Sequence, residues 1–259
     1  MTGFLEKAAH SARANVARWR DTYPDPPVMD RNPPPLFLPF DDDGCGIIAE
    51  VKRRSPSRGD LMGARDPLSL PEVYSKAGAA AVSIVVEERY FGGSTELFEG
   101  VREKTALPLL WKDFVVDPFQ IRLAAALGAS AVLLIAGMLS DSDLAGFLET
   151  ARETGIRALV EIHDSVELER AMAAGADLLG VNNRDLVTLE VDLGVSEILA
   201  SKVPQGIQKV SESGIRTPED VERMAGLGYR AVLVGESLVT AQDAQGLLGE
   251  MVKAGKISF

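Results

Sequence analysis

From residue 46 onward the chain alternates short apolar runs with segments of helical periodicity. The apolar runs are rich in Val, Ile and Leu and almost uninterrupted, which is typical of strands buried on both faces. Several of the amphipathic segments between them begin at a capping residue or a first-turn proline and end at a glycine, as helices often do. We predict strands over residues 47–52, 81–87, 109–114, 131–136, 158–162, 178–182, 208–212 and 231–235, and helices that include 118–127, 141–154, 165–174, 218–227 and 241–252.

Strand and helix form one unit that repeats eight times. Successive strand ends, taken at positions 50, 87, 112, 135, 161, 182, 212 and 235, lie 21 to 37 residues apart. Eight βα units in a chain of about 250 residues describe a (β/α)8 barrel, or TIM barrel. An open doubly wound sheet is the alternative, but nothing in the sequence favours the strand order that it would need. We therefore predict an α/β protein of the (β/α)8 class.

The first 45 residues differ from this repeat. Residues 1–20 carry apolar side chains at helical spacing and predict an amphipathic helix. Residues 23–40 are rich in proline and predict an extended connector, which ends at a turn-forming cluster over 41–44. We expect an N-terminal extension over 1–45 that packs on a barrel domain over 46–259. Whether it acts as a lid or only as a packing arm stays open.

Polar and ionisable residues stand at the carboxyl ends of the predicted strands, where such barrels place their chemistry. In strand 47–52, Glu50 and Lys52 project from the same face because residues two apart in a strand do so. Taken alone, this pair is equally well explained as a salt bridge. Because the same pattern recurs at most of the other ends, we expect one shared active site. The residues concerned are Glu50, Lys52, Glu87, Lys112, Glu161, Asn182, Arg184, Glu212, Ser213 and Gly235.

Two of these residues are the candidates for moving protons. Lys112 shares a strand face with Leu110 and Phe114, and burial beside a second lysine, Lys52, would favour its neutral form. Glu161 stands among apolar residues and is a candidate base. His163 is expected on the opposite face, in a structural role.

The last two strands are followed by small, glycine-bearing turns. The sequences Ser213-Gly214-Ile215 and Gly235-Glu236-Ser237 expose backbone N–H groups before a helix, which favours anion binding. Loops after strands seven and eight commonly bind phosphate in barrels. Ser55, after the first strand, could close such a site from the other side. We favour a phosphate site over simple turn chemistry because both loops carry the signal.

The composition limits the classes of molecule that the protein is expected to bind. The formal net charge of -11 argues against nucleic acid and acidic membranes, but not against a small anionic substrate in a locally cationic cleft. No apolar run approaches the roughly 18 residues of a membrane helix, and the charged N-terminus does not resemble a signal peptide. A single cysteine, Cys45, fits a reducing cytosol. We expect a cytoplasmic protein, a monomer or a weak homo-oligomer, without a metal-ligand cluster.

Eight segments stand out along the barrel units: IIAEVKRRSPSRG (47–59), ERYFGGS (88–94), KDFVVDPFQI (112–121), AVLLIA (131–136), LVEIHD (159–164), GVNNRDL (180–186), VSESGI (210–215) and LVGESL (233–238). Together, and in this order, they resemble the indole-3-glycerol phosphate synthase family. Members of that family convert 1-(2-carboxyphenylamino)-1-deoxyribulose 5-phosphate to indole-3-glycerol phosphate, CO2 and water in tryptophan biosynthesis, with no cofactor.

The resemblance implies a role for each matching residue. Lys112 is implied as the general acid that protonates the ribulose carbonyl, and Glu161 as the base of the later dehydration. Glu50 and Lys52 are implied as partners in that proton transfer and in holding the substrate carboxylate. Asn182 and Glu212 would orient substrate hydroxyls and the lysine network, and Arg184 would lie at the rim. Phosphate would bind Ser55, Ser213, Gly214, Gly235 and the backbone N–H of Glu236, and the aromatic ring would lie among Phe91, Phe114, Leu133 and Leu233.

Three departures and two alternatives remain. Val85-Val86 precede Glu87, where the family often has threonine, so the role of Glu87 is open; Trp111 stands where many members have arginine; and the first 45 residues match only loosely. One alternative is another phosphate-binding barrel enzyme, such as phosphoribosylanthranilate isomerase, which would be expected to use a Cys/Asp pair. The other is a non-catalytic barrel subunit, which unneeded buried charge argues against.

Overall fold

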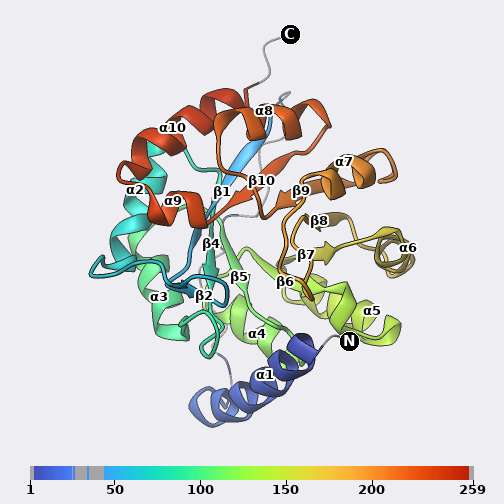
Figure 1. Ribbon diagram of the computed structural model, residues 1–259. Coiled ribbons are helices and arrows are strands. Elements are labelled where there is room, and N and C mark those ends of the chain that lie inside the picture. The colour runs from blue at the N-terminus through green and yellow to red at the C-terminus, as the bar shows by residue number, and fades with distance from the viewer. Residues whose placement is uncertain (1–2, 25, 27–33, 35–43, 257–259) are drawn as a thin grey trace.

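Eight parallel strands close into a barrel that is surrounded by helices (Figure 1). The structure is a computed structural model, and it describes residues 3–24, 26, 34 and 44–256. Neighbouring strands follow the order β1-β10-β9-β8-β7-β6-β5-β4, and β1 also pairs with β4, which closes the circle. The predicted (β/α)8 barrel is confirmed, and the open doubly wound sheet is excluded.

The barrel strands and the helices agree closely with the predicted segments. The strands are β1 Gly46–Val51, β4 Ala81–Val85, β5 Leu109–Lys112, β6 Ala131–Ile135, β7 Arg157–Ile162, β8 Leu178–Asn182, β9 Gln208–Glu212 and β10 Ala231–Val234. The helices are α1 Gly3–Thr22, α2 Leu70–Ala77, α3 Thr95–Lys104, α4 Pro118–Ala126, α5 Asp141–Glu153, α6 Ser165–Ala173, α7 Gly194–Ala200, α8 Pro218–Gly226, α9 Glu236–Thr240 and α10 Ala244–Ala254.

The differences lie mainly at the strand ends. Several predicted strands extend one or two residues too far, so that Lys52, Glu87 and Gly235 belong to the loops that follow β1, β4 and β10. A short antiparallel pair, β2 Arg54–Ser55 and β3 Gly59–Asp60, was not predicted and shapes the loop after β1. The segment predicted as one helix over 241–252 contains α10, which begins at Ala244 because the Asp243 side chain caps it by accepting the Gly246 N–H at 2.8 Å.

Alternation along each strand separates the core of the barrel from the layer under the helices. In β1, Ile47, Ala49 and Val51 belong to the apolar cluster beneath the helices, whereas Ile48 belongs to the cluster inside the barrel. The same period places Leu110 inside and Trp111 outside in β5. Glu50 and Lys112 therefore follow Ile48 and Leu110 along the inner face, as the sequence predicted.

Helix α1 confirms the predicted N-terminal helix and packs across the loops after β4 and β5. Trp19 stacks edge-on against Trp111, with ring centroids 6.0 Å apart. Arg20 binds the Asp117 carboxylate at 2.9 Å and lies over the Phe119 ring. The connector over 23–40 and the turn over 41–44 lie almost wholly outside the described residues, so those predictions stay untested.

Candidate active site

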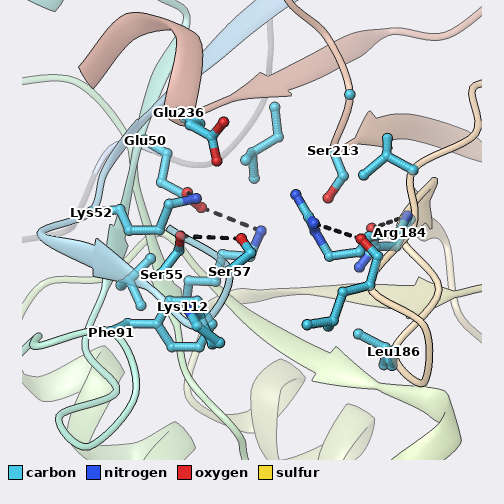
Figure 2. Close-up of a pocket in the computed structure, with 18 of the residues that line it drawn as sticks. Glu50, Lys52, Ser55, Ser57, Phe91, Lys112, Arg184, Leu186, Ser213 and Glu236 are labelled. Carbon is cyan, nitrogen blue, oxygen red and sulfur yellow. Dashed lines mark hydrogen bonds and ion pairs between the residues drawn. The ribbon is translucent and has the colours of Figure 1, made fainter. Parts of the chain in front are cut away.

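A cavity of about 470 Å³ opens at the carboxyl ends of the barrel strands (Figure 2). It is lined by residues from all eight βα units, which are far apart in the sequence. Of the sixteen residues to which the sequence gave a catalytic or binding role, fifteen line it: Glu50, Lys52, Ser55, Phe91, Lys112, Phe114, Leu133, Glu161, Asn182, Arg184, Ser213, Gly214, Leu233, Gly235 and Glu236. The sixteenth, Glu212, is fully buried beneath it and reaches the cavity through Lys112.

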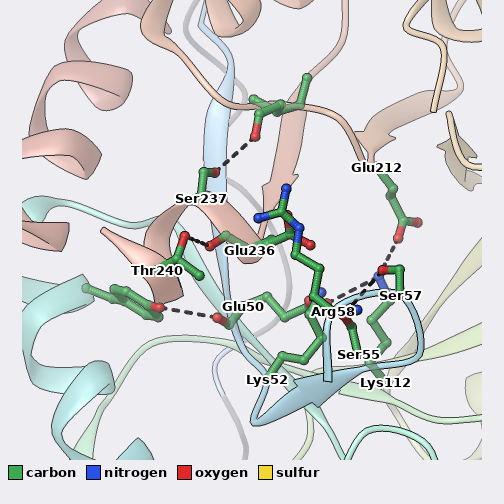
Figure 3. Close-up of polar contacts among 12 residues, drawn as sticks. Glu50, Lys52, Ser55, Ser57, Arg58, Lys112, Glu212, Glu236, Ser237 and Thr240 are labelled. Atoms are coloured by element: carbon green, nitrogen blue, oxygen red, sulfur yellow. Dashed lines mark hydrogen bonds and ion pairs between the residues drawn. The ribbon is translucent and has the colours of Figure 1, made fainter. Parts of the chain in front are cut away.

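Opposite charges are packed together on one side of this cavity (Figure 3). Lys112 Nζ donates to Glu212 Oε2 at 2.8 Å and lies 3.4 Å from Glu50 Oε2. Lys52 Nζ lies 2.7 Å from Glu50 Oε1. Glu50 therefore bridges two lysines, and Lys112 bridges two carboxylates that come from opposite parts of the chain. Such contacts hold each charged group at a defined position before any substrate arrives.

The prediction that Lys112 favours its neutral form is wrong. Burial alone would lower the pKa of Lys112, but the carboxylates of Glu212, Glu50 and Glu161 outweigh it and raise the pKa above its ordinary value. The sequence showed only the second lysine, whereas the fold adds three carboxylates from β1, β7 and β9. Lys112 is therefore an ammonium group with a proton to give across the neutral range.

The carboxylates in this cluster divide into two kinds. Burial would raise the pKa of Glu50, but Lys52 and Lys112 outweigh it and lower the pKa to about 2. Burial raises the pKa of Glu212 to about 6, because the attraction of Lys112 is opposed by the nearby carboxylates of Glu161 and Glu50. Glu50 is therefore a permanent anion, while Glu212 can gain a proton near neutral pH.

Glu161 is not isolated among apolar groups, as the sequence suggested. His163 Nε2 lies 3.4 Å from Glu161 Oε1, so the placement of His163 on the opposite face is wrong. Residues 161 and 163 are two apart, and the side chains follow the same side of the chain, as Glu50 and Lys52 do. Glu161 is among the residues that line the cavity, and His163 is not.

The two glycine-bearing turns after β9 and β10 lie next to each other on the cavity wall. Ser237 Oγ donates to the Ile215 carbonyl at 3.1 Å, which joins the two loops. Ser213 adopts a left-handed φ of 64°, unusual for a residue with a side chain, and Gly214 follows with φ 88°. The Asn183 side chain holds this turn by donating to the Ser213 carbonyl at 3.1 Å. The strained turn is thus fixed in place by the loop after β8.

The first-strand loop closes the same wall. Ser55 Oγ accepts the backbone N–H of Arg58 at 3.2 Å, which folds the loop back on itself. The Arg58 guanidinium Nε lies 2.9 Å from Glu236 Oε1 (Figure 3). Because the Glu236 side chain turns toward Arg58, its backbone N–H is the group left for an anion.

An apolar wall faces the charged cluster. Phe114 lies 6.3 Å from Phe91 and 6.0 Å from Phe4 of helix α1, measured between ring centroids. Leu133 and Leu233, from β6 and β10, complete this surface. A planar aromatic group fits such a wall, with charged side chains close by to act on it.

Glu87, whose role the sequence left open, shapes this wall. Its carboxylate accepts the backbone N–H groups of Arg89, Tyr90 and Phe91 at 3.1, 2.7 and 3.0 Å. Burial raises the pKa of Glu87 even though these hydrogen bonds oppose it. Its observed contacts are therefore those of a loop anchor that places Phe91 in the cavity.

Comparison with known proteins agrees with this geometry. A model of the family described as "Indole-3-glycerol phosphate synthase" matches residues 37–251. The chain belongs to the indole-3-glycerol phosphate synthase family. The resemblance found in the eight ordered segments is thereby confirmed, and members of this family are carboxy-lyases of tryptophan biosynthesis.

Individual relatives in the family cover most of the chain. The indole-3-glycerol phosphate synthase of a Parafrankia species is 50% identical over 209 residues, which are 81% of this chain and 78% of the relative. That of Saccharopolyspora erythraea is 42% identical over 256 residues, or 97% and 95% of the two chains. Thiamine phosphate pyrophosphorylase from Pyrococcus furiosus superposes with a TM-score of 0.62 at 16% identity, over 81% of this chain and 94% of that one, which supports the barrel fold alone.

Some cavity residues of this family member were not anticipated. Phe4 could not be placed because nothing in the sequence brings the first helix to the barrel mouth. Arg58 and Arg216 line the cavity as further cations. Arg58 had a usable signal, since it lies in the segment 47–59, whereas Arg216 lies just beyond the segment 210–215. Asn183, which is buried behind the cavity lining and hydrogen-bonded to Glu212 of β9 and Ser196 of α7, also had one, since it directly follows Asn182 in the GVNNRDL segment.

Three further observations concern the isomerase alternative, metal binding and membrane helices. Cys45, the thiol that an isomerase-like Cys/Asp pair would need, is buried outside the cavity, and burial raises its pKa to about 12. Within the described residues, no group of three or more His, Cys, Asp and Glu side chains is arranged to bind a metal ion. None of the helices described has the length and apolar character needed to cross a membrane.

Proposed function

We propose that this chain closes the indole ring of 1-(2-carboxyphenylamino)-1-deoxyribulose 5-phosphate, releasing CO2 and water to give indole-3-glycerol phosphate. The observation that supports this most strongly is the Lys112 ammonium, held at a cavity floor by carboxylates from three other strands. The reaction needs a proton donor of this kind beside an anion-binding wall and an apolar wall. This cavity has all three.

We place the substrate with its two anionic ends held apart. The phosphate binds the backbone N–H groups of the turns at Ser213–Gly214 and Gly235–Glu236, with Ser55 closing over it. The anthranilate ring lies on the wall of Phe91 and Phe114. Figure 2 shows Lys52 and Arg184 on opposite sides of the cavity. Holding both ends bends the flexible chain toward the ring carbon, which is an orientation problem that a rigid site solves. Lys52 takes the carboxylate, and Arg184 stands at the rim.

Ring closure begins at Lys112. As the ring carbon that carries the carboxylate attacks the ribulose carbonyl carbon, Lys112 donates a proton to the carbonyl oxygen, which becomes a hydroxyl. CO2 then leaves, and its bonding electron pair restores the aromatic ring. Glu212 and Glu50 hold the ammonium in position during this step. Asn182, whose Oδ1 accepts the Arg184 N–H at 3.0 Å, orients a substrate hydroxyl through its amide nitrogen.

Dehydration completes the indole. Glu161 removes a proton from the CH2 carbon that lies between the nitrogen and the hydroxyl-bearing carbon. The hydroxyl gains a proton from the lysine network and leaves as water. The Glu50 anion holds Lys52 at 2.7 Å, and Lys52 is the member of this pair that exchanges protons. The overall reaction transfers no electrons to an acceptor and no group to a carrier, so we expect no cofactor.

The phosphate assignment predicts a specific sensitivity at Gly235. A Cβ atom at this position would overlap Glu50 Oε1 and lie 3.2 Å from Lys52 Nζ. Gly235→Ala is therefore expected to raise KM about 10- to 100-fold, the loss of one to two hydrogen bonds to a charged group, and also to lower kcat. The matched control is Gly226→Ala at the end of α8, where an added Cβ meets nothing within 4 Å. Equal KM values for the two variants would contradict the assignment.

The proposal also covers the oligomeric state, the domain division and the binding partner of the enzyme. We propose a cytoplasmic monomer or weak homo-oligomer, in which residues 1–45 form an extension on the barrel domain 46–259. Its partner is a small anionic substrate rather than nucleic acid or a membrane, in keeping with the net charge of -11. Phe4, contributed by α1 to the cavity wall, supports a lid-like part for the extension.

A direct assay tests the activity. Purified chain mixed with the carboxyphenylamino-deoxyribulose phosphate is expected to produce indole fluorescence without added metal or cofactor, and at an unchanged rate after treatment with a chelator. The isomerase alternative predicts turnover of phosphoribosylanthranilate instead. A non-catalytic subunit would bind the substrate and give no product, and that outcome would refute the proposal.

A further inference from the structure

The imidazole ring of His163 lies between two carboxylates at the end of β7. Its Nδ1 is 3.0 Å from Glu167 Oε2, and its Nε2 is 3.4 Å from Glu161 Oε1. Glu167 Oε2 also accepts the backbone N–H of His163 at 2.8 Å. Glu167, in the first turn of α6, thereby fixes the ring so that its other nitrogen faces the residue proposed as the catalytic base.

This arrangement suits the imidazolium form of His163. A neutral imidazole has one N–H donor and one bare nitrogen. If the donor serves Glu167, a bare Nε2 is left facing a carboxylate oxygen, and this nitrogen is buried without a hydrogen-bond partner among the described residues. A protonated ring offers an N–H group at each nitrogen and so can serve both carboxylates.

The surrounding charges act in the same direction. Burial would lower the pKa of His163, but the hydrogen bond with Glu167 and the carboxylates of Glu161, Glu167 and Glu212 outweigh it and raise the pKa to about 9. These groups face the ring from β7, α6 and β9. Asp185, in the loop after β8, adds a fourth carboxylate, whose pKa is lowered mainly by backbone hydrogen bonds and in small part by His163.

Glu161 consequently lies between two cations. Lys112 interacts electrostatically with Glu161, and His163 Nε2 lies 3.4 Å from its Oε1. Our prediction from the sequence separated Glu161 from His163, because it placed His163 on the opposite strand face. In the fold, His163 is not among the residues that line the cavity, but it contacts Glu161, which is.

We propose that His163 is a positioning residue whose imidazolium contacts the Glu161 carboxylate and keeps it oriented toward the cavity. This inference rests on the proposed role of Glu161 as the base of dehydration. In this arrangement Glu167 orients the His163 ring, and the ring orients the carboxylate of the proposed base, Glu161.

The charge state of His163 can be measured without substrate. The chain has two histidines, His10 and His163, so the imidazole C2 protons give two NMR signals that a His10→Gln variant assigns. His163 is expected to titrate near pH 9, and in Glu161→Gln to titrate at least about one unit lower, since one unit corresponds to the loss of a moderate ionic contact. A His163 signal that titrates near 6.5 in both proteins would overturn the proposal.

Kinetics test its consequence. His163→Gln removes the charge, and we expect kcat at neutral pH to fall about tenfold with KM unchanged, because the Glu161 carboxylate loses the group that orients it. His163→Lys restores a positive charge and is expected to recover most of the lost kcat. Because kcat is calculated per folded protein, a poorly folding variant still gives an answer.

The control is His10→Gln, which changes an exposed histidine in α1 and should leave kcat and KM unaltered. A loss of kcat in His163→Gln that His163→Lys does not recover would show a merely structural role and refute the inference. The NMR titration separates the two proposals. If the chain does not form indole, the ring-closing function is refuted. The change in the His163 titration between the unaltered protein and Glu161→Gln still tests the contact between these two residues independently.

Discussion

Lys112→Met is expected to lower kcat about 10³-fold and to leave KM within a few-fold of its original value, because it removes a general acid and little binding energy. Methionine keeps the length of the side chain but carries no proton. Glu212 loses its partner at 2.8 Å, and because its pKa already lies at about 6, it can take up a proton instead of remaining a buried, unpaired charge. Glu50 keeps Lys52 at 2.7 Å.

The matched control for this change is Lys76→Met. Lys76 is an exposed lysine of α2 that pairs with Glu72 at 2.7 Å, far from the cavity lining. Its replacement should leave kcat unaltered, since exposed pairs of this kind contribute little to stability. Thermal unfolding of both variants shows whether the barrel is intact. A folded Lys112→Met protein with kcat close to that of the unchanged chain would mean that another group supplies the proton.

Glu161→Gln is expected to stop the reaction at a later point. The amide cannot accept the proton that dehydration releases, so kcat should fall about 10²- to 10³-fold with little change in KM. Ring closure and loss of CO2 depend on Lys112 and should still occur. In a single turnover we therefore expect CO2 to be released in stoichiometric amount while indole fluorescence stays low, whereas Lys112→Met should release neither product.

This order of events distinguishes the two roles. Glu149→Gln, at an exposed glutamate of α5 paired with Arg152, is the control and should release CO2 and form indole together. If Glu161→Gln loses both products to the same degree, Glu161 acts before decarboxylation, and its assignment to dehydration is wrong. If it loses neither, Glu161 is not the base.

Much of the fold and of the cavity could be predicted because both follow from periodicity. The two-residue period of a strand places Glu50 behind Ile48 and Lys112 behind Leu110, and the structure has these apolar residues inside the barrel. Parallel strands bring their carboxyl ends to one side of the barrel. Residues as distant in the sequence as Ser55 and Glu236 could therefore be assigned to one cavity before the strand order was known.

The distances between side chains of different βα units could not be predicted from the sequence. The charge state of Lys112 depends on carboxylates that lie 62, 49 and 100 positions away at Glu50, Glu161 and Glu212, and only the closed barrel sets how near they come. His163 is a different case, because the two-residue strand period puts it on the face of Glu161 and our prediction of the opposite face misapplied that period. Phe4 needed knowledge of where α1 docks, which depends on contacts such as that of Trp19 with Trp111.

The most direct test of the site is a crystal structure of Glu161→Gln with substrate soaked in, since this variant should hold the substrate or its ring-closed product. The account predicts the phosphate on the backbone N–H groups of Gly214 and Glu236, the aromatic ring against Phe114, and the carbonyl or hydroxyl oxygen about 3 Å from Lys112 Nζ. A phosphate bound elsewhere, or an oxygen out of reach of Lys112, would contradict it.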